Sequence, residues 1–253
     1  MSAPIWSATA GAGPDFVLIH GSLDRSAGML KLSRRLDTAW RVTRYDRRGY
    51  GRSTPHAGPF TLDAQIADLV ALIHGLGRAG APVVLFGHSF GGNVALGVAD
   101  RYPELVRAVA IYESPLSWVE WWPRDSAGAE AAMLADDPEN AAEAFMRRLI
   151  GDNRWERLPE STRDARRREG PAMLGELADL RSGPPWHPDR IVVPVLTMFG
   201  ERGRPHHHQG MDWVAGAVPD GRVRMVPGAH HFGPNTHPDA VAELLNEFVQ
   251  PLG

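Results

Sequence analysis

The amino-acid sequence predicts an α/β protein with a mostly parallel central sheet, helices on both faces and one helical insertion. Three observations carry this prediction: short apolar runs of strand length, helical patterns between them, and one long segment without a strand pattern. Alternating strands and helices are typical of a parallel sheet whose two faces are covered. With 253 residues, the chain is long enough to bury one large core.

Six apolar runs bounded by turn residues predict buried strands, because they are short and rich in β-branched residues. They cover residues 16–19, 42–45, 83–86, 108–112, 192–199 and 223–226. Between them, apolar residues at helical spacing predict helices. These cover residues 62–76, 92–102 and 238–249.

One region breaks this alternation. Residues from about 116 to 186 contain no convincing strand, and the stretch is rich in Ala, Arg and Glu with several Pro and Gly breaks. We therefore predict a helical cap over residues 116–186, inserted after the strand that ends near Glu113. Residues 1–115 and 187–253 are predicted to form the core.

Composition narrows the possible functions. Apolar residues make up 43% and charged residues 23% of the chain, which is ordinary for a soluble globular protein, and the net charge of −3 gives no reason to expect nucleic acid. We see no run of 18 apolar residues and no signal peptide. Cysteine is absent, which suits a reducing compartment. We therefore expect a cytoplasmic monomer or homodimer that binds a small-molecule substrate and neither a membrane nor nucleic acid. We also expect no cofactor, since no phosphate-binding loop or dinucleotide fingerprint occurs.

The stretch "GHSFGG" at residues 87–92 places Ser89 between a predicted strand and a predicted helix. Glycine on both sides lets the backbone turn tightly, and such a turn lifts the serine hydroxyl clear of the sheet. It also directs the N–H of Phe90 to the place where negative charge would develop in a reaction. We interpret Ser89 as a nucleophile; the alternative is a structural turn serine.

A second motif, "VLIHGS" at residues 17–22, ends an apolar strand in His20 and Gly21. The loop after it can present a backbone N–H, from Ser22 or from Leu23, as the second donor of an oxyanion hole. His20 precedes the serine in the chain. We interpret it as a residue that shapes this loop rather than as a catalytic group.

Together with two further stretches, these motifs resemble the α/β-hydrolase fold superfamily in its capped, esterase-like form. The resemblance is carried by "HGS" at 20–22, "DRRGYGRS" at 46–53, "GHSFGG" at 87–92 and "GAHHFGPNTHPDAV" at 228–241. It covers nearly the whole chain, although the N-terminus leaves room for one strand, at 5–9, where the family usually has two. The resemblance implies a serine hydrolase with a nucleophile elbow, an oxyanion hole formed by the N–H groups of Ser22 and Phe90, and a catalytic triad.

A serine hydroxyl needs a base, and histidine is suited because its pKa lies near neutrality. The resemblance places the base after the last strand, where His230 and His231 are adjacent. Alignment on the following Phe makes His231 the base, and His230 then stands where glycine is usual. His237, which precedes a proline, is interpreted as the residue that begins the last helix.

The acid that orients the base is missing from its most common place. Many family members have Asp in a Gly-x-x-Asp pattern after the strand predicted at 192–199, whereas this chain has Gly203. Some members carry the acid one strand earlier, and Glu113 lies at the end of that strand. Adjacent strand ends are about 5 Å apart, so either can serve the same histidine. We predict Glu113 as the acid; Glu201 is the next candidate, and the alternative is that Glu113 only shapes the pocket.

The predicted cap begins with Trp118, Trp121 and Trp122, whose spacings of three and four place them on one helical face. We predict that these residues and Leu23 line the substrate pocket as a wall for an apolar acyl or aromatic group. The alternative is that the tryptophans pack the cap onto the core.

The stretch "RPHHHQG" at residues 204–210 invites a metal site. Three consecutive histidines cannot share one face of a helix or strand, so they form a poor tetrahedral site. We interpret the stretch as a flexible polar loop and predict no metal.

The sequence therefore predicts a cofactor-independent serine hydrolase that cleaves an ester, thioester or lactone of a small apolar or aromatic acid through an acyl-enzyme. A C–C bond (diketone) hydrolase is the close alternative, and haloperoxidase- or acyltransferase-like activity uses the same residues. Epoxide hydrolases and dehalogenases of this family have Asp where Ser89 stands, so these activities are disfavoured. A non-catalytic ligand-binding protein is a further alternative, which the missing Asp supports.

Overall fold

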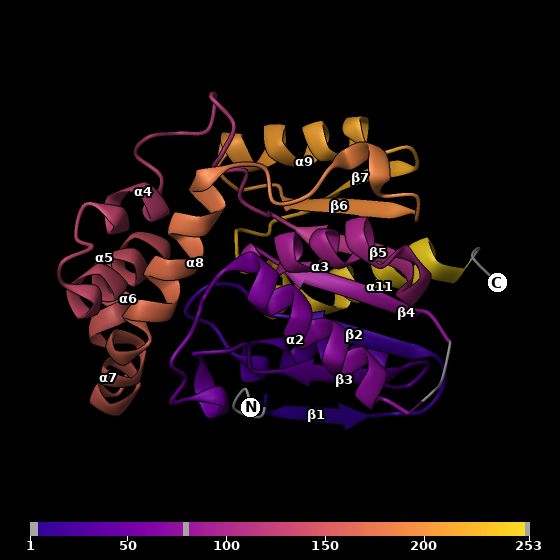
Figure 1. Cartoon of the computed structure of the whole chain (residues 1–253), viewed down its shortest axis with the longest axis horizontal. Helices are drawn as coiled ribbons and strands as arrows, with labels where there is room; N and C mark the ends of the chain where they lie inside the picture. The colour runs from indigo at the N-terminus through magenta and orange to yellow at the C-terminus, as the bar shows by residue number, and fades with distance from the viewer. Residues whose placement is uncertain (1–4, 78–80, 251–253) are drawn as a thin grey trace.

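The computed structural model describes residues 5–77 and 81–250, and these residues form a seven-stranded sheet (Figure 1). The strands are β1 (Ser7–Ala10), β2 (Asp15–Ile19), β3 (Arg41–Tyr45), β4 (Val83–His88), β5 (Val106–Tyr112), β6 (Val195–Gly200) and β7 (Gly221–Val226). Their order is β1-β3-β2-β4-β5-β6-β7; β1 pairs antiparallel with β3, and every other neighbouring pair is parallel. The predicted fold class is confirmed.

Helices cover both faces of the sheet, because successive strand residues point to opposite sides. Within β2, Val17 faces a core built with helices α2, α3 and α9, whereas Phe16 faces a second core built with α1 and α11. These helices are α1 (Leu30–Leu36), α2 (Leu62–Gly75), α3 (Phe90–Arg101), α9 (Pro205–Ala217) and α11 (Pro238–Val249). The short elements between them are η1 (Ser26–Met29), η2 (Gly51–Ser53), η3 (Pro103–Leu105), η4 (Pro188–Arg190) and α10 (Gly233–Thr236).

Five further helices lie beside the sheet and the helices that cover it, on the left of Figure 1. They are α4 (Ala127–Ala132), α5 (Pro138–Ile150), α6 (Asp152–Glu156), α7 (Glu160–Arg168) and α8 (Gly170–Ser182). We refer to the sheet and its covering helices as the core. The side chains of Ser126 and Asp137 accept the N–H groups of Ala129 and Asn140, in the first turns of α4 and α5, and so fix where these helices begin. We refer to residues 116–186, in which the structure describes no strand, as the cap. Helix α8 contacts both α5 of the cap and α2 of the core.

Three elements differ from the sequence prediction. The strand expected from residue 192 begins at Val195, because Val192 is 67% exposed and Pro194 has no N–H for a ladder. The expectation of a flexible loop at 204–210 was wrong: this stretch belongs to α9, whose first turn tolerates Pro205 because an N–H there needs no helical partner. Helix α1 was not predicted.

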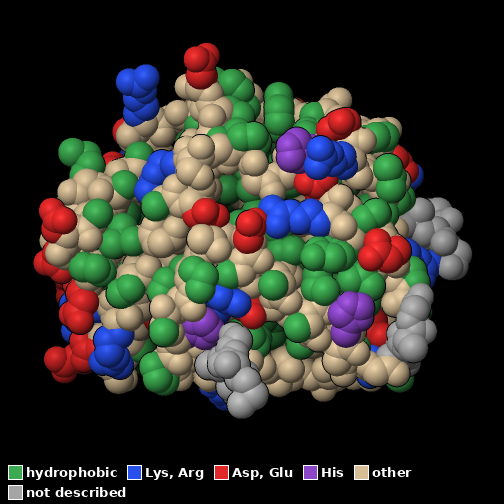
Figure 2. Space-filling model, viewed as in Figure 1, with side chains coloured by type: hydrophobic (Ala, Val, Ile, Leu, Met, Phe, Trp, Pro, Cys, Tyr) green, Lys and Arg blue, Asp and Glu red, His purple; other side chains and the backbone are tan. Residues whose placement is uncertain are grey.

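The visible surface mixes charges of both signs. Lys and Arg side chains are interspersed with Asp and Glu over the face in Figure 2, in keeping with the small net charge of −3. Among the residues that the structure describes, no helix is both long and apolar enough to cross a membrane.

Candidate active site

Ser89 stands on the turn between β4 and α3, at the carboxyl edge of the sheet. Its backbone, with φ 53° and ψ −126°, has a conformation that non-glycine residues rarely adopt and that costs on the order of 1–3 kcal/mol. Two hydrogen bonds hold the turn: the N–H of Ser89 donates to the carbonyl of Tyr112 at 2.8 Å, and the N–H of Gly92 donates to the carbonyl of Ser89 at 2.9 Å. Phe90 follows as the first residue of α3, where backbone N–H groups have no intrahelical partner.

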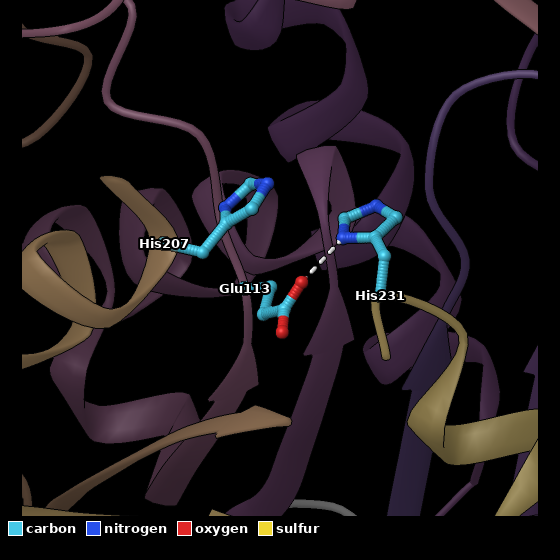
Figure 3. A group of neighbouring side chains, drawn as sticks. All are labelled: Glu113, His207 and His231. Carbon is cyan, nitrogen blue, oxygen red and sulfur yellow. Dashed lines mark hydrogen bonds and ion pairs between the residues drawn. The ribbon is translucent and has the colours of Figure 1, made fainter. Parts of the chain in front are cut away.

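His231 and Glu113 are joined by a hydrogen bond (Figure 3). Glu113 directly follows β5, and His231 lies in the loop after β7. The Nδ1 of His231 lies 2.8 Å from Oε2 of Glu113, and Oε1 of the same carboxylate accepts the N–H of Gly200 at 2.9 Å. Because an ionised carboxylate can only accept, Nδ1–H is the donor. In neutral His231, Nε2 is therefore free to accept a proton.

The Glu113 side chain is fully buried, yet its surroundings favour the ionised form. Burial alone raises the pKa of this carboxyl group. The hydrogen bond from His231 and the charge of that ring, with smaller contributions from His207 and Gly200, lower the pKa of Glu113 from 4.5 to about 2. Glu113 thus provides the stable negative charge that an imidazolium at His231 needs.

The contacts around Gly203 show why position 203, three residues after β6, carries no carboxylate while Glu113 follows β5. A Cβ at residue 203 would lie less than 3.0 Å from Oε1 of Glu113, so any side chain there would collide with the carboxylate. A side chain at position 203 and the carboxylate of Glu113 therefore compete for one space in this chain. The glycine at 203 fits a site in which Glu113 takes that space, so it no longer supports the non-catalytic alternative.

The competing candidates for base and acid are engaged elsewhere. The exposed His230 donates from Nδ1 to the carbonyl of Arg202 at 2.9 Å. Glu201, also exposed, accepts the N–H of Gly228 at 2.7 Å. His237 is the N-cap residue of α11.

Two histidines that the sequence analysis did not select pack against His231. His207, in the first turn of α9, stacks on it with ring centroids 5.0 Å apart and planes at 25°. His88 lies at the end of β4, and its ring centroid is 4.9 Å from that of His231. Its Nε2 donates to the backbone carbonyl of His231 at 2.8 Å. Burial and then the charge of His231 lower the pKa of His207 well below 6.5 and that of His88 to about 3. Both rings therefore stay neutral and do not repel an imidazolium at His231.

Glu113, His207 and His231 form a group whose potential ligand atoms lie within 4.8 Å of one another (Figure 3). These residue types bind zinc in other proteins. Here both oxygens of Glu113 and the Nδ1 of His231 already take part in hydrogen bonds. We therefore describe the group as a hydrogen-bonded acid–base pair with a third ring packed on it.

The loop after β2 passes close to Ser89. A Cβ at Gly21 would lie 2.9 Å from the Cβ of Ser89, so glycine allows this close approach. His20 is buried beside the loop, where its Nε2 accepts the N–H of Arg47 at 2.9 Å and its Nδ1–H donates to the carbonyl of Gly21 at 2.7 Å. His20 thus fixes the backbone ahead of Ser22, in agreement with a shaping role.

A cavity of about 240 Å³ lies between the core and the cap. Its lining includes Ser22, Ser89 and His231 from the core, Trp122, Phe145, Leu149 and Leu177 from the cap, and His206 and His207 from α9. Of the four predicted pocket residues, Trp122 lines this cavity. The other three, Leu23, Trp118 and Trp121, are not among the described lining residues. Leu23 is 1% exposed within the apolar core. The ring of Trp118 packs on Trp186, and that of Trp121 packs on Trp122.

Backbone strain is found at the carboxyl ends of three neighbouring strands, β2, β4 and β5. Over residues 5–77 and 81–250, the non-glycine residues with positive φ are Leu23, Ser89 and Glu113, with values of 50°, 53° and 46°. They belong to the loop after β2, the turn after β4 and the end of β5. Such strain persists only where the surrounding structure enforces it, and it clusters at functional sites.

Comparison with known proteins agrees with this geometry. A sequence model described as the Alpha/beta hydrolase family matches residues 16–244. The chain belongs to the alpha/beta hydrolase family. This alpha/beta hydrolase is 28% identical to the 2-(acetamidomethylene)succinate hydrolase of Mesorhizobium japonicum, over 94% of this chain and 89% of the relative. It is 27% identical to the pimeloyl-(acyl-carrier protein) methyl ester esterase of Chromobacterium violaceum, over 96% of each chain.

Solved structures share the fold. An esterase from Thermogutta terrifontis with malate bound matches with a TM-score of 0.79 and 22% identity, over 98% of this chain and 93% of the esterase. An enol-lactonase from Burkholderia xenovorans matches with a TM-score of 0.72 and 22% identity, over 97% of this chain and 96% of the lactonase. Because the curated relatives are hydrolases and esterases, this alpha/beta hydrolase is an enzyme of the esterase-like hydrolase kind.

The depressed pKa of Glu113 makes a prediction about stability. Ionised Glu113 stabilises the folded state above pH 4.5, and this contribution is lost as the pH falls through about 2. Above pH 5, we expect the free energy of unfolding of the wild-type protein to be higher than that of Glu113→Gln by on the order of 3 kcal/mol. The difference should shrink steadily towards pH 2.5. Urea titrations of both proteins between pH 2.5 and 7 measure it, and a difference independent of pH would contradict the assignment of a buried ionised Glu113.

Proposed function

We propose that this chain is a cofactor-independent serine hydrolase with Ser89, His231 and Glu113 as its catalytic triad, cleaving an ester, thioester or lactone of a small apolar or aromatic acid. The observation that carries the proposal is the 2.8 Å hydrogen bond between His231 and the buried Glu113, at the sheet edge where Ser89 occupies a strained turn. Esterases and hydrolases among the relatives support the same chemistry.

In the proposed reaction, the Oγ of Ser89 attacks the substrate carbonyl carbon while Nε2 of His231 accepts the hydroxyl proton. Glu113 stabilises the resulting imidazolium through Nδ1–H and does not take the proton. The backbone N–H groups of Ser22 and Phe90 stabilise the oxyanion. His231 then protonates the leaving group, and an acyl ester remains on Ser89. Water then loses a proton to His231 and attacks this ester, and His231 returns that proton to the Oγ of Ser89 as the carboxylic acid leaves.

The cavity supports a small acyl group. Its volume of about 240 Å³ is below the roughly 300–1,000 Å³ of pockets that bind drug-sized ligands. Four apolar cap side chains, those of Trp122, Phe145, Leu149 and Leu177, line it together with Ser89 and His231. A short aliphatic or single-ring acyl group fits these walls better than a long lipid chain.

A panel of p-nitrophenyl esters tests the proposed reaction class. We expect turnover of acetate, butyrate and benzoate esters, with kcat/KM falling for octanoate and longer acyl groups. Intact-mass analysis of acid-quenched enzyme should show an acyl adduct that maps to Ser89. Turnover of the esters without any adduct on Ser89 would argue against the acyl-enzyme, and absence of any ester, thioester or lactone turnover would argue against the function.

Trp122 and its neighbour Trp121 provide a matched test of the acyl pocket, because only Trp122 is among the described lining residues. Trp122→Ala enlarges the cavity, so we expect the ratio of kcat/KM for octanoate over acetate to rise about tenfold or more, as one or two methylenes gain room. Trp121→Ala should leave this ratio within about twofold. Equal ratios in both variants would place the acyl group elsewhere.

A further inference from the structure

A buried carboxylate of the cap reaches the loop that passes Ser89. Glu176, on α8, is 0% exposed. Its Oε1 accepts the hydroxyl of Ser22 at 2.5 Å and that of Tyr50 at 2.7 Å, and its Oε2 accepts Nη1 of Arg47 at 2.6 Å and Nε2 of Gln65 at 3.0 Å. A buried charge is tolerated only where it is paired and fully hydrogen-bonded, and this carboxylate meets that condition.

Arg47 connects the same carboxylate to the other end of the loop. Its side chain is 1% exposed and forms an ion pair with Glu176. Its Nε donates to the carbonyl of His20 at 2.9 Å, and its backbone N–H donates to the ring of His20 at the same distance. The loop is therefore held at His20 by Arg47 and at Ser22 by Glu176.

These anchors bear directly on the nucleophile. Gly21, between the two anchored residues, packs against Ser89, and Leu23 after them has a positive φ of 50°. A loop in a strained conformation keeps its place only when its surroundings enforce it. The hydroxyl of Ser22 has its carboxylate partner in the cap rather than in the core.

We propose that Glu176 is a positioning residue: through the hydroxyl of Ser22 it sets the oxyanion loop, so that the oxyanion hole reaches its working geometry only when the cap is docked. This inference rests on the proposed serine hydrolase function and extends it, because it assigns a task in the reaction to a side chain of the cap. Loss of one oxyanion donor typically costs about 10²–10³ in kcat, and a displaced donor costs part of that.

Ser22→Ala tests the proposal with the smallest change, because it keeps the backbone N–H and removes only the contact to Glu176. We expect kcat to fall about 10- to 100-fold with KM within about twofold, and the rate of Ser89 phosphonylation by a fluorophosphonate to fall by a similar factor. Ser22→Thr, which retains a hydroxyl, should recover most of the loss. Glu176→Gln should lower kcat and the phosphonylation rate by at least as much as Ser22→Ala does.

Asp179→Asn is the matched control on the same helix. Asp179 also links α8 to the core, since its Oδ2 accepts the N–H of Leu62 at 2.8 Å, but this contact is to α2 and not to the oxyanion loop. We expect its kcat and phosphonylation rate within about twofold of wild type, even if its melting temperature falls.

The outcomes separate the inference from the proposed function. Equal kcat in wild type and Ser22→Ala, or equal losses in Ser22→Ala and Asp179→Asn, would overturn the positioning role while leaving the serine hydrolase standing. Wild-type enzyme that neither turns over an ester nor reacts with the probe at Ser89 would overturn both.

Discussion

Glu113→Gln is expected to lower kcat/KM about 10⁴-fold, the largest loss expected here from a change that leaves the nucleophile and the base in place. A glutamine presents a neutral amide to Nδ1 of His231. It neither stabilises an imidazolium nor secures the tautomer in which Nε2 accepts a proton. KM should change little, because Glu113 lies behind His231 and is not among the described residues that line the cavity. Steady-state kinetics on a p-nitrophenyl ester measure both constants.

Glu201→Gln is the matched control for this prediction. Glu201 follows β6, where the family more often has its acid, but its side chain is bonded to the N–H of Gly228 at the surface. We expect kcat/KM within about threefold of wild type, as for other exposed hydrogen bonds. A large loss in Glu201→Gln with a small loss in Glu113→Gln would reverse the assignment of the acid.

Gly203→Asp is expected to inactivate the enzyme although it restores the more common family pattern. The new Cβ would collide with Oε1 of Glu113, and a second carboxylate would repel the first in a buried site. We expect kcat/KM to fall at least about 10²-fold, because the hydrogen bond from His231 depends on the position that Glu113 holds now. The measurement is the same ester assay, with circular dichroism to verify folding.

The double variant Glu113→Ala/Gly203→Asp separates collision from chemistry. Removing the Glu113 carboxylate makes room for an aspartate at 203, which can then approach the same histidine from β6. We expect its kcat/KM to exceed that of Glu113→Ala by about tenfold or more. If Gly203→Asp alone keeps wild-type activity, the two acid positions do not compete and the explanation of Gly203 is wrong.

The strands and the turn at Ser89 were predictable because their signals are local. Buried parallel strands appear as short apolar runs, and a serine between glycines at the end of such a run marks a strand-to-helix turn. Glu113 could be proposed as the acid because it ends the strand beside the more common acid position, whereas chain order alone also allows Glu201. The 2.8 Å contact between His231 and Glu113 supports this proposal, but it joins residues 118 positions apart and so has no local signal in the sequence.

The histidines around His231 could not be found in this way. His207 belongs to a run of three histidines that looks like a polar loop, and its place follows from α9 packing beside β6 and β7. His88 directly precedes Ser89 in the chain, and nothing in the sequence around it indicates a contact with His231. The contact between Glu176 and Ser22 spans 154 residues and depends on how the cap docks, which no local pattern encodes.

Labelling with a fluorophosphonate probe, with the adduct mapped by mass spectrometry, tests most directly whether Ser89 is a nucleophile activated by the pair of His231 and Glu113. We expect rapid modification of Ser89 in wild type and loss of this reaction in Glu113→Gln. Folded wild-type protein that stays unlabelled, or labelling that is as fast in Glu113→Gln as in wild type, would contradict this activation of Ser89.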